Sequence, residues 1–292
     1  MRNYKKIVVV ILTLIILSIT IWFYFSNLNN SKINNNIEEV TTNIELPFVY
    51  NFNTDENLYE AGSMNESTSP YWWLNSGAYM DISKNVGKTV QGSLDSSNVW
   101  RQTYSKTNPL DTDNGYHPQN IFRLVTKYKL QNSEEEAYFK ITSNNFSSSP
   151  NRNESNGLLL FERYVDHNNL YYAGVRVDGF AIIKKKINGT YFTLGSKNLF
   201  SNSAYDKNTN PNSLPLNLWI GLKVETVNSP NGSVNIKLYT DMNETGIWTL
   251  VLESNDDNQT YGGKAITSNG FLGIRTDFMD VEFKKFSVNK IN

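Results

Sequence analysis

Residues 169–194 read NLYYAGVRVDGFAIIKKKINGTYFTL, and their alternation of apolar and polar side chains is typical of β-strands. Successive side chains in a strand point to opposite faces, so the first strand should have a core face and an open face. The core set is Tyr171, Ala173, Val175 and Val177, and the open set is Tyr172, Gly174, Arg176 and Asp178. Asp178-Gly179 and Asn188-Gly189 are hairpin signals, so this stretch predicts three consecutive antiparallel strands.

The same alternation recurs toward the C-terminus, in short segments that Gly, Pro, Asn and Ser interrupt. The residues expected to face inward there are Leu218, Ile220, Leu222, Val224, Val234, Ile236, Leu238, Leu272 and Ile274. No segment after residue 26 shows a convincing helical period. Residues 45–292 are therefore predicted to form one all-β domain, an antiparallel two-sheet β-sandwich of the jelly-roll type, with a long polar loop at residues 200–217.

The N-terminus differs from the rest of the chain. Residues 7–25 are apolar and uncharged, about the length that crosses a bilayer, and Arg2, Lys5 and Lys6 precede them. Positive charge stays in the cytoplasm, so residues 1–26 predict a cytoplasmic tip and a transmembrane signal-anchor in the cell membrane. Residues 27–44, rich in Asn, should form a stalk that holds the C-terminal domain outside the cell. A cleaved signal peptide is the alternative, but bulky aromatics stand where its small residues belong.

Composition excludes several function classes. The chain has 292 residues and a net charge of −1, so it has no general basic field and no nucleic-acid partner is expected. It has no cysteine, which excludes thiol nucleophiles and thiolate metal sites. Its two histidines are too few for a multi-histidine metal site. Without disulfides, an exported domain of this size must be stabilised by its own core.

Four segments carry a family resemblance. They are GLLLFERY with NLYYAGVRVDGFAIIKKKINGTYFTL (within residues 157–194), LPLNLWIGLKVE, VNIKLYTD and GFLGIRTDFMDVEFKKFSV. In this order they resemble the concanavalin A-like lectin/glucanase superfamily, and are most similar to laminin-G-like and 3-keto-disaccharide-hydrolase-like domains. The resemblance covers residues 48–288 and implies two antiparallel sheets, the concave one binding glycans. We therefore expect a carbohydrate-binding, lectin-like domain with a poly- or oligosaccharide partner.

The family's catalytic signatures are missing. Its best-known glycosidases carry a Glu-x-Asp-x-Glu strand, whereas Glu134-Glu135-Glu136 has the wrong spacing and is interpreted as a solvated edge or loop. Tyr138-Phe139-Lys140 matches only one of the three signature strands of jelly-roll alginate lyases. Binding without catalysis is thus the favoured hypothesis. The alternatives are a glycoside hydrolase or polysaccharide lyase that uses His117 and Tyr172, and a structural or adhesive envelope protein.

Candidate binding residues gather around the segment HPQNIFR at residues 117–123. Arginine binds carboxylates in a bidentate manner, and histidine can act as a base. The predicted ligand-binding set is Asn120, Arg123, Arg163, Arg176 and Asp178, with the three arginines on one open sheet face. The structural alternative places His117 in a turn and pairs the arginines with Glu162 or Asp178 across strands.

Aromatic and acidic residues complete the candidates. Rings of Trp72, Trp73 and Tyr172 could stack on sugars, although Trp is mostly a core residue, and Trp72 and Trp73 should face opposite sides of their strand. Lys184, Lys185 and Lys186 are interpreted as a solvated strand end, and His167 as a surface turn residue. Asp277 and Asp280, or Asp111 and Asp113, could hold a structural calcium ion with backbone oxygens, and no other cofactor is expected.

Overall fold

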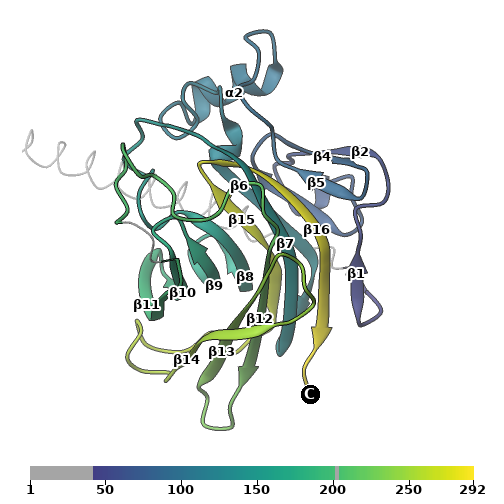
Figure 1. Cartoon of the computed structure of the whole chain (residues 1–292). Helices are drawn as coiled ribbons and strands as arrows, with labels where there is room; N and C mark the ends of the chain where they lie inside the picture. Colours follow the sequence, from purple (N-terminus) through teal and green to yellow (C-terminus); the bar gives the residue numbers. More distant parts are fainter. Residues whose placement is uncertain (1–41, 201–203) are drawn as a thin grey trace, which may run out of the picture. The chain divides into compact units, whose positions relative to one another are not determined.

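Two antiparallel β-sheets face each other in the computed structural model, which describes residues 42–200 and 204–292 (Figure 1). This is the sandwich that the sequence and its family resemblance predicted. The anchor at residues 7–25 and nearly all of the predicted stalk lie outside the described residues, so both stay predictions. In the described part of the chain, no helix is long and apolar enough to cross a membrane.

The first sheet has seven strands, and it contains the three strands predicted from residues 169–194. Their hairpin turns form as expected, with positive φ at Gly179, Asn188 and Gly189. In spatial order the strands are β11 (Thr190–Asn198), β10 (Phe180–Ile187), β9 (Asn169–Arg176), β8 (Gly157–Asp166), β15 (Gly270–Asp277), β6 (Ile121–Leu130) and β3 (Trp72–Ser76).

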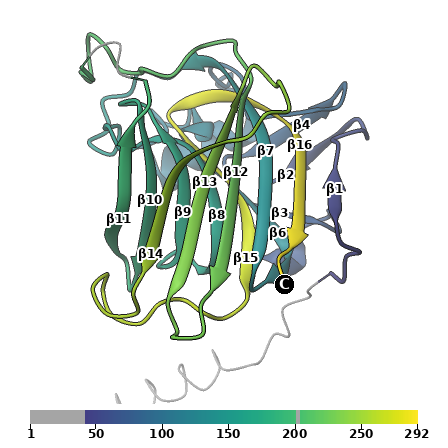
Figure 2. The same cartoon turned by 60° about the horizontal axis from the view of Figure 1, so that its bottom comes forward.

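The second sheet has nine strands. Figure 2 shows its strands β14, β13 and β12 in front of β10, β9 and β8 of the first sheet. Its spatial order is β14 (Thr249–Asp256), β13 (Val234–Met242), β12 (Ile220–Asn228), β7 (Ser133–Asn144), β16 (Met279–Lys290), β5 (Val86–Lys88), β4 (Tyr79–Ser83) and β2 (Glu56–Tyr59). The short β1 (Phe48–Tyr50) pairs with the C-terminal part of β16, at residues 286–288.

The main core lies between the two sheets and contains the side chains predicted to face inward. From β9 and the turn after it these are Tyr171, Ala173, Val175 and Val177, and the predicted residues of β12, β13 and β15 join them. Leu218 is the exception, because it precedes β12 and is only half-buried.

A second apolar cluster covers part of the outer face of the seven-stranded sheet. Phe161, Tyr172, Ile182 and Phe271 pack there, and Met64 of the short 3-10 helix η1 (Met64–Glu66) caps them. Tyr172 is consequently only 3% exposed, although it lies on the face predicted to be open. The outer face is therefore partly apolar, which suits a binding surface better than a fully solvated one.

One helix contradicts the expectation of an all-strand domain. α2 (Val99–Thr107) begins at Asn98, whose side chain accepts a hydrogen bond from the Trp100 backbone N–H at 2.9 Å. Tyr104, four residues after Trp100, is buried, and its hydroxyl donates to Glu60 at 2.5 Å. A weak apolar stripe and one N-cap thus suffice for a helix that docks on the sandwich. A second 3-10 helix, η2 (Pro118–Asn120), leads into β6.

Two charged segments are placed differently from the prediction. Glu134-Glu135-Glu136 lies in β7, between β12 and β16 in the nine-stranded sheet, so it is neither an edge nor a loop. Glu135 points between the sheets and is fully buried. Lys185 is also fully buried, because its strand alternates and the side chain points inward to Asp256 at 2.8 Å.

Candidate functional site

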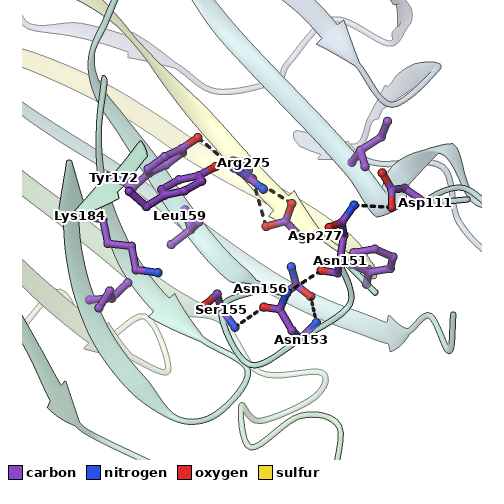
Figure 3. A pocket seen from close by; sticks show the side chains of 14 residues that line it. Asp111, Asn151, Asn153, Ser155, Asn156, Leu159, Tyr172, Lys184, Arg275 and Asp277 are labelled. Carbon is purple, nitrogen blue, oxygen red and sulfur yellow. Dashed lines mark hydrogen bonds and ion pairs between the residues drawn. The ribbon is translucent and has the colours of Figure 1, made fainter. Parts of the chain in front are cut away.

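A pocket of about 400 Å³ opens on the outer face of the seven-stranded sheet. Its floor comes from the strands and its rim from the loops before η2 and between β7 and β8 (Figure 3). The lining residues are Asp111, Ile121, Asn151, Asn153, Ser155, Asn156, Leu159, Tyr172, Ile182, Lys184, Tyr191, Arg275, Asp277 and Phe278. This size is in the range of small-ligand sites.

Two stacked tyrosines form one wall of the pocket. Tyr172 of β9 and Tyr191 of β11 have ring centroids 6.0 Å apart and an interplanar angle of 28°. They meet because each points outward from its strand, with β10 between the two strands. Tyr172 is buried, whereas Tyr191 is 47% exposed, with Nζ of Lys186 lying 4.8 Å from the centroid of its ring.

Arg275 of β15 fixes the inner end of this wall. Its Nη1 donates to the Tyr172 hydroxyl at 2.9 Å, and its Nε donates to both carboxylate oxygens of Asp277 at 2.9 and 3.1 Å. Burial lowers the pKa of Arg275, but the Asp277 charge outweighs burial and holds that pKa above its usual value. Burial raises the pKa of Asp277, and Arg275 opposes this effect. The pair is a rigid, internally neutralised part of the site.

Lys184 of β10 is the free cation of the pocket. Its Nζ lies 5.8 Å from the centroid of the Tyr191 ring and forms no hydrogen bond or ion pair with any residue the structure describes. Burial lowers the pKa of Lys184, and the nearby guanidinium groups of Arg176 and Arg275 lower it further. Figure 3 shows the amine directed into the hollow.

The two tyrosine hydroxyls differ in acidity. Burial raises the pKa of Tyr172 to about 12. Burial also acts to raise the pKa of Tyr191, but Arg275 and Lys186 outweigh it, and the pKa lies below its usual value. Tyr191 is therefore the phenol of the site that deprotonates more readily.

Amides and carboxylates form the rim opposite the tyrosines. The Asn151 side chain donates to Asp111 at 2.9 Å, and Ser149 donates to the same oxygen at 2.6 Å. Asn153 accepts from the Ser155 backbone at 2.9 Å, and its own backbone N–H donates to Asn156 at 2.8 Å. These contacts hold the loop in shape. The rim thus presents amide and hydroxyl groups of the kind that bind sugar hydroxyls.

The sequence predicted part of this surface. Tyr172, the residue predicted as a stacking platform, lines the pocket, and Asp277 lines it as the partner of Arg275. Lys184 also lines it, although the lysine run was interpreted as a solvated strand end. Arg123 and Arg176 share the outer face but are not among the lining residues, because Arg123 donates to Asn75 at 2.9 Å and Arg176 pairs with Asp178.

The prediction of three arginines on one open face is wrong, because Arg163 is buried. A bulge in β8 shifts the pairing register after Glu162, and Arg163 adopts φ +52. The alternation of faces breaks at this point. The guanidinium donates instead to Asn228 of the other sheet and to the Ile266 carbonyl. Arg163 therefore braces the sandwich, and no anion site of three arginines exists.

His117 and Asn120 are structural as well. Both ring nitrogens of His117 are engaged, Nδ1 with Asp113 and Nε2 with Ser93, each at 2.8 Å. Asn120 is fully buried and donates to the Asp111 carbonyl at 2.8 Å and to Asp113 at 3.2 Å. Neither residue lines the pocket, so the structure does not bring His117 together with Tyr172. The contacts of His117 and Asn120 instead hold the loop that carries Asp111.

The paired tryptophans face opposite sides, as predicted. Trp72 is fully buried in the main core, 4.7 Å from Phe286 between ring centroids. Trp73 packs against the outer apolar cluster, and its indole N–H donates to the Ala61 carbonyl at 2.9 Å. Neither ring lines the pocket, whose aromatic wall is formed by Tyr172 and Tyr191 instead.

The calcium hypothesis gains no support from the contacts. Among the described residues, no group of three or more Asp, Glu, His or Cys side chains is arranged to hold a metal ion. Asp280 accepts hydrogen bonds from the Gly92 backbone, Gln119 and Asn145, at 2.6 to 2.9 Å. Asp277 is bound by Arg275, so the two candidate ligands serve different structural contacts.

Tyr191 and Arg275 were missed as site residues. Arg275 could have been found from strand alternation, because Ile274 was expected inside and its neighbour must then point outward. Tyr191 lies in the strand that the Asn188-Gly189 turn predicts. Its contact with Tyr172, two strands away, depends on the twist and order of the sheet. The Asn-rich rim has no pattern of its own in the sequence.

No protein-family model and no curated protein matches the chain. Several solved structures are similar to it. They include the carbohydrate-binding module CBM66 from Bacillus subtilis, with 16% identity over 59% of this chain and 83% of the module and a TM-score of 0.41. A beta-glucanase of Bacillus licheniformis has 10% identity over 86% of this chain and all of its own, with a TM-score of 0.45. The exoplasmic/lumenal domain of VIP36, bound to Ca²⁺ and Man, has 9% identity over 80% and 89% and a TM-score of 0.38. These values are too low to transfer a function.

Proposed function

We propose that the domain binds a poly- or oligosaccharide in the pocket on the outer face of the seven-stranded sheet. The observation that carries this proposal is the stack of Tyr172 and Tyr191, whose outer ring, that of Tyr191, is 47% exposed. A sugar presents an apolar C–H face edged by hydroxyls, and a phenol ring can cover that face while leaving the hydroxyls to polar groups.

The rest of the pocket supplies those polar groups. Amide side chains of Asn151 and Asn153, the Ser155 hydroxyl and the Lys184 amine surround the space beside the rings. Pockets that combine an apolar wall with a few oriented polar groups are typical of small-ligand sites. The rim loop is cross-linked by hydrogen bonds within itself, so little ordering is needed when a ligand binds.

The proposed location is the outside of the cell, on a membrane anchor formed by residues 7–25. Support comes from the basic residues that precede the apolar segment, since positive charge stays in the cytoplasm. Protease added to intact cells should release the domain. Protection of the domain from the protease would contradict this topology.

Binding is tested with the full-length chain in mild detergent on a glycan array, followed by titration calorimetry with the best ligand. Tyr191→Ala should weaken binding by about tenfold, the effect of one lost ring contact. Tyr59→Ala is the matched control, because Tyr59 is 53% exposed on β2 of the other sheet. Failure of every glycan to bind, or equal losses in both variants, would overturn the proposal.

Polysaccharide lyase activity is a second candidate, and the lowered pKa of Tyr191 favours it. A phenolate there could remove the C5 proton of a uronate, after which the C4–O bond breaks and the leaving oxygen takes up a proton. Release of unsaturated uronate that Tyr191→Phe abolishes would establish this activity. Hydrolysis is less favoured, because Arg275 engages Asp277 while Ser149 and Asn151 engage Asp111.

A further inference from the structure

The charged side chains that line the pocket differ in whether a neighbouring group interacts with their charge. Arg275 and Asp277 neutralise each other through two hydrogen bonds. Asp111, at the other end of the pocket, accepts from Ser149 and Asn151. Lys184 alone among the charged lining residues has no hydrogen bond or ion pair within the described chain. A half-buried cation without a partner is costly, and a ligand can remove that cost.

We propose that the pocket selects saccharides that carry a carboxylate, and that Lys184 binds this carboxylate. This inference rests on the proposed saccharide binding and specifies its ligand class. The carboxylate of a uronic acid projects from the edge of the sugar ring. With the ring stacked on Tyr191, whose centroid is 5.8 Å from Nζ of Lys184, that edge group is within reach of the amine.

The surroundings of Lys184 strengthen the case for an anion. The charged groups that face it are Arg176 and Arg275, which repel it, and Asp178, which attracts it. Asp178 is already paired with Arg176, as Asp277 is with Arg275. The β10 end of the pocket therefore carries a net positive charge. A carboxylate placed there meets one free ammonium and two guanidinium groups nearby.

The end of the pocket at Asp111 carries a negative charge, and this difference between the two ends sets the orientation of the ligand. Figure 3 shows Lys184 on one side of the hollow and Asp111 on the other. Asp111 and its bound amide, Asn151, offer acceptors and donors to hydroxyl groups but repel a second carboxylate. We therefore expect the acidic sugar unit at the Tyr191 end and a neutral part of the chain toward Asp111.

The test compares each acidic oligosaccharide with its own uncharged counterpart. The panel contains oligomers of glucuronate, galacturonate, mannuronate and guluronate, each paired with the same oligomer after reduction of its carboxylates to alcohols. The full-length protein should bind the acidic member of its best pair about tenfold more tightly at low salt, with a smaller ratio at high salt.

Three variants test whether Lys184 causes the preference for the acidic oligosaccharide. Lys184→Gln should abolish the preference for the acid, and Lys184→Arg should keep it. Lys197→Gln is the control, because Lys197 is exposed on β11 and does not line the pocket. Equal binding of acidic and reduced oligomers would overturn this inference and leave saccharide binding standing. A preference that survives in Lys184→Gln would remove Lys184 from the role. No binding by any oligomer of the panel or glycan of the array would refute the proposed function itself.

Discussion

Glu135 of β7 and Glu162 of β8 point toward each other from different sheets, and both are fully buried. No described residue donates a hydrogen bond to either carboxylate oxygen of Glu135. Glu162 accepts one from the Ser133 hydroxyl at 2.8 Å. Two buried carboxyl groups that face each other cannot both be ionised, so at least one of them must hold a proton. Burial raises the pKa of Glu162 to about 7, and burial together with the Glu162 charge raises that of Glu135 well above its usual value.

This pair predicts that the domain loses stability as the pH rises. The unfolded chain titrates near 4.5 and the folded Glu162 near 7, so the folded state binds more protons between these values. Stability from this source is complete below the unfolded pKa and is lost as pH passes the folded pKa. For Glu162 the loss is on the order of 3 kcal/mol. Urea unfolding from about pH 5 to about pH 8, at constant ionic strength, measures it.

Variants separate this pair from other titrating groups. Glu135→Gln keeps the shape of the side chain and removes the second charge, so its stability should depend less on pH than that of the wild type. Glu134→Gln is the control, because Glu134 is the preceding residue in β7 and its side chain is partly exposed. Stability that rises across this pH range, or the same slope in all three proteins, would contradict the prediction.

The buried contacts of Lys185 predict that removing its side chain greatly lowers the stability of the domain. Its Nζ is 2.8 Å from Asp256 and donates to the carbonyls of Gly263 and Lys264 at 3.0 and 2.8 Å, with both ionic side chains fully buried. Removing one partner leaves a buried charge, which costs about 3–5 kcal/mol. Lys185→Ala should therefore lower the free energy of unfolding by about that amount. Lys186→Ala, one residue on and partly exposed, should change it by less than about 0.5 kcal/mol. Equal effects of the two variants would mean that the pair does not stabilise the fold.

Asn98 predicts a smaller effect that is confined to α2. Its side chain caps the helix through the Trp100 N–H, so Asn98→Ala should cost about 1 kcal/mol, whereas Asn98→Asp should retain most of the stability. Hydrogen exchange of the amides of α2 should speed up in the alanine variant, while exchange in β9 and β10 should not. Uniform loss of protection across the domain would show instead that α2 unfolds only with the sandwich.

The sequence predicted the strands well where one period governs a whole segment. Residues 169–194 and 218–238 alternate so regularly that their inward side chains could be named, because burial of one face requires that period. α2 has no such signal, since a nine-residue helix with one N-cap depends on the surface that receives Tyr104. Glu135 and Lys185 were misjudged because charged residues are almost never fully buried unless they are paired, and their pairing is invisible in the sequence.

The candidate site was predicted only in part, for a geometric reason. Tyr172 followed from alternation in its strand, but alternation also placed Arg163 on the open face, and the bulge at that residue reverses it. Contacts between strands that are distant in the chain decide the rest. Tyr191 meets Tyr172, and Arg275 reaches the Tyr172 hydroxyl, only because the sheet order is β11-β10-β9-β8-β15. That order cannot be read from the periodicity of single strands.

Asp277 predicts a change in ligand preference that a structural role alone would not produce. Asp277→Asn keeps the shape of the side chain and leaves Arg275 bound to the Tyr172 hydroxyl, but it removes the charge that neutralises the guanidinium. One additional uncompensated charge strengthens the binding of a carboxylate by about tenfold if the two charges are separated by on the order of 10 Å at an effective dielectric constant near 20. The ratio of affinities for an acidic oligosaccharide and its reduced counterpart should increase by that factor, while binding of the reduced form stays nearly constant. Asp178→Asn, which frees Arg176 outside the pocket lining, should change the ratio less. Calorimetric titration of the three proteins checks this, and an unchanged ratio in Asp277→Asn would show that Arg275 does not act on the ligand.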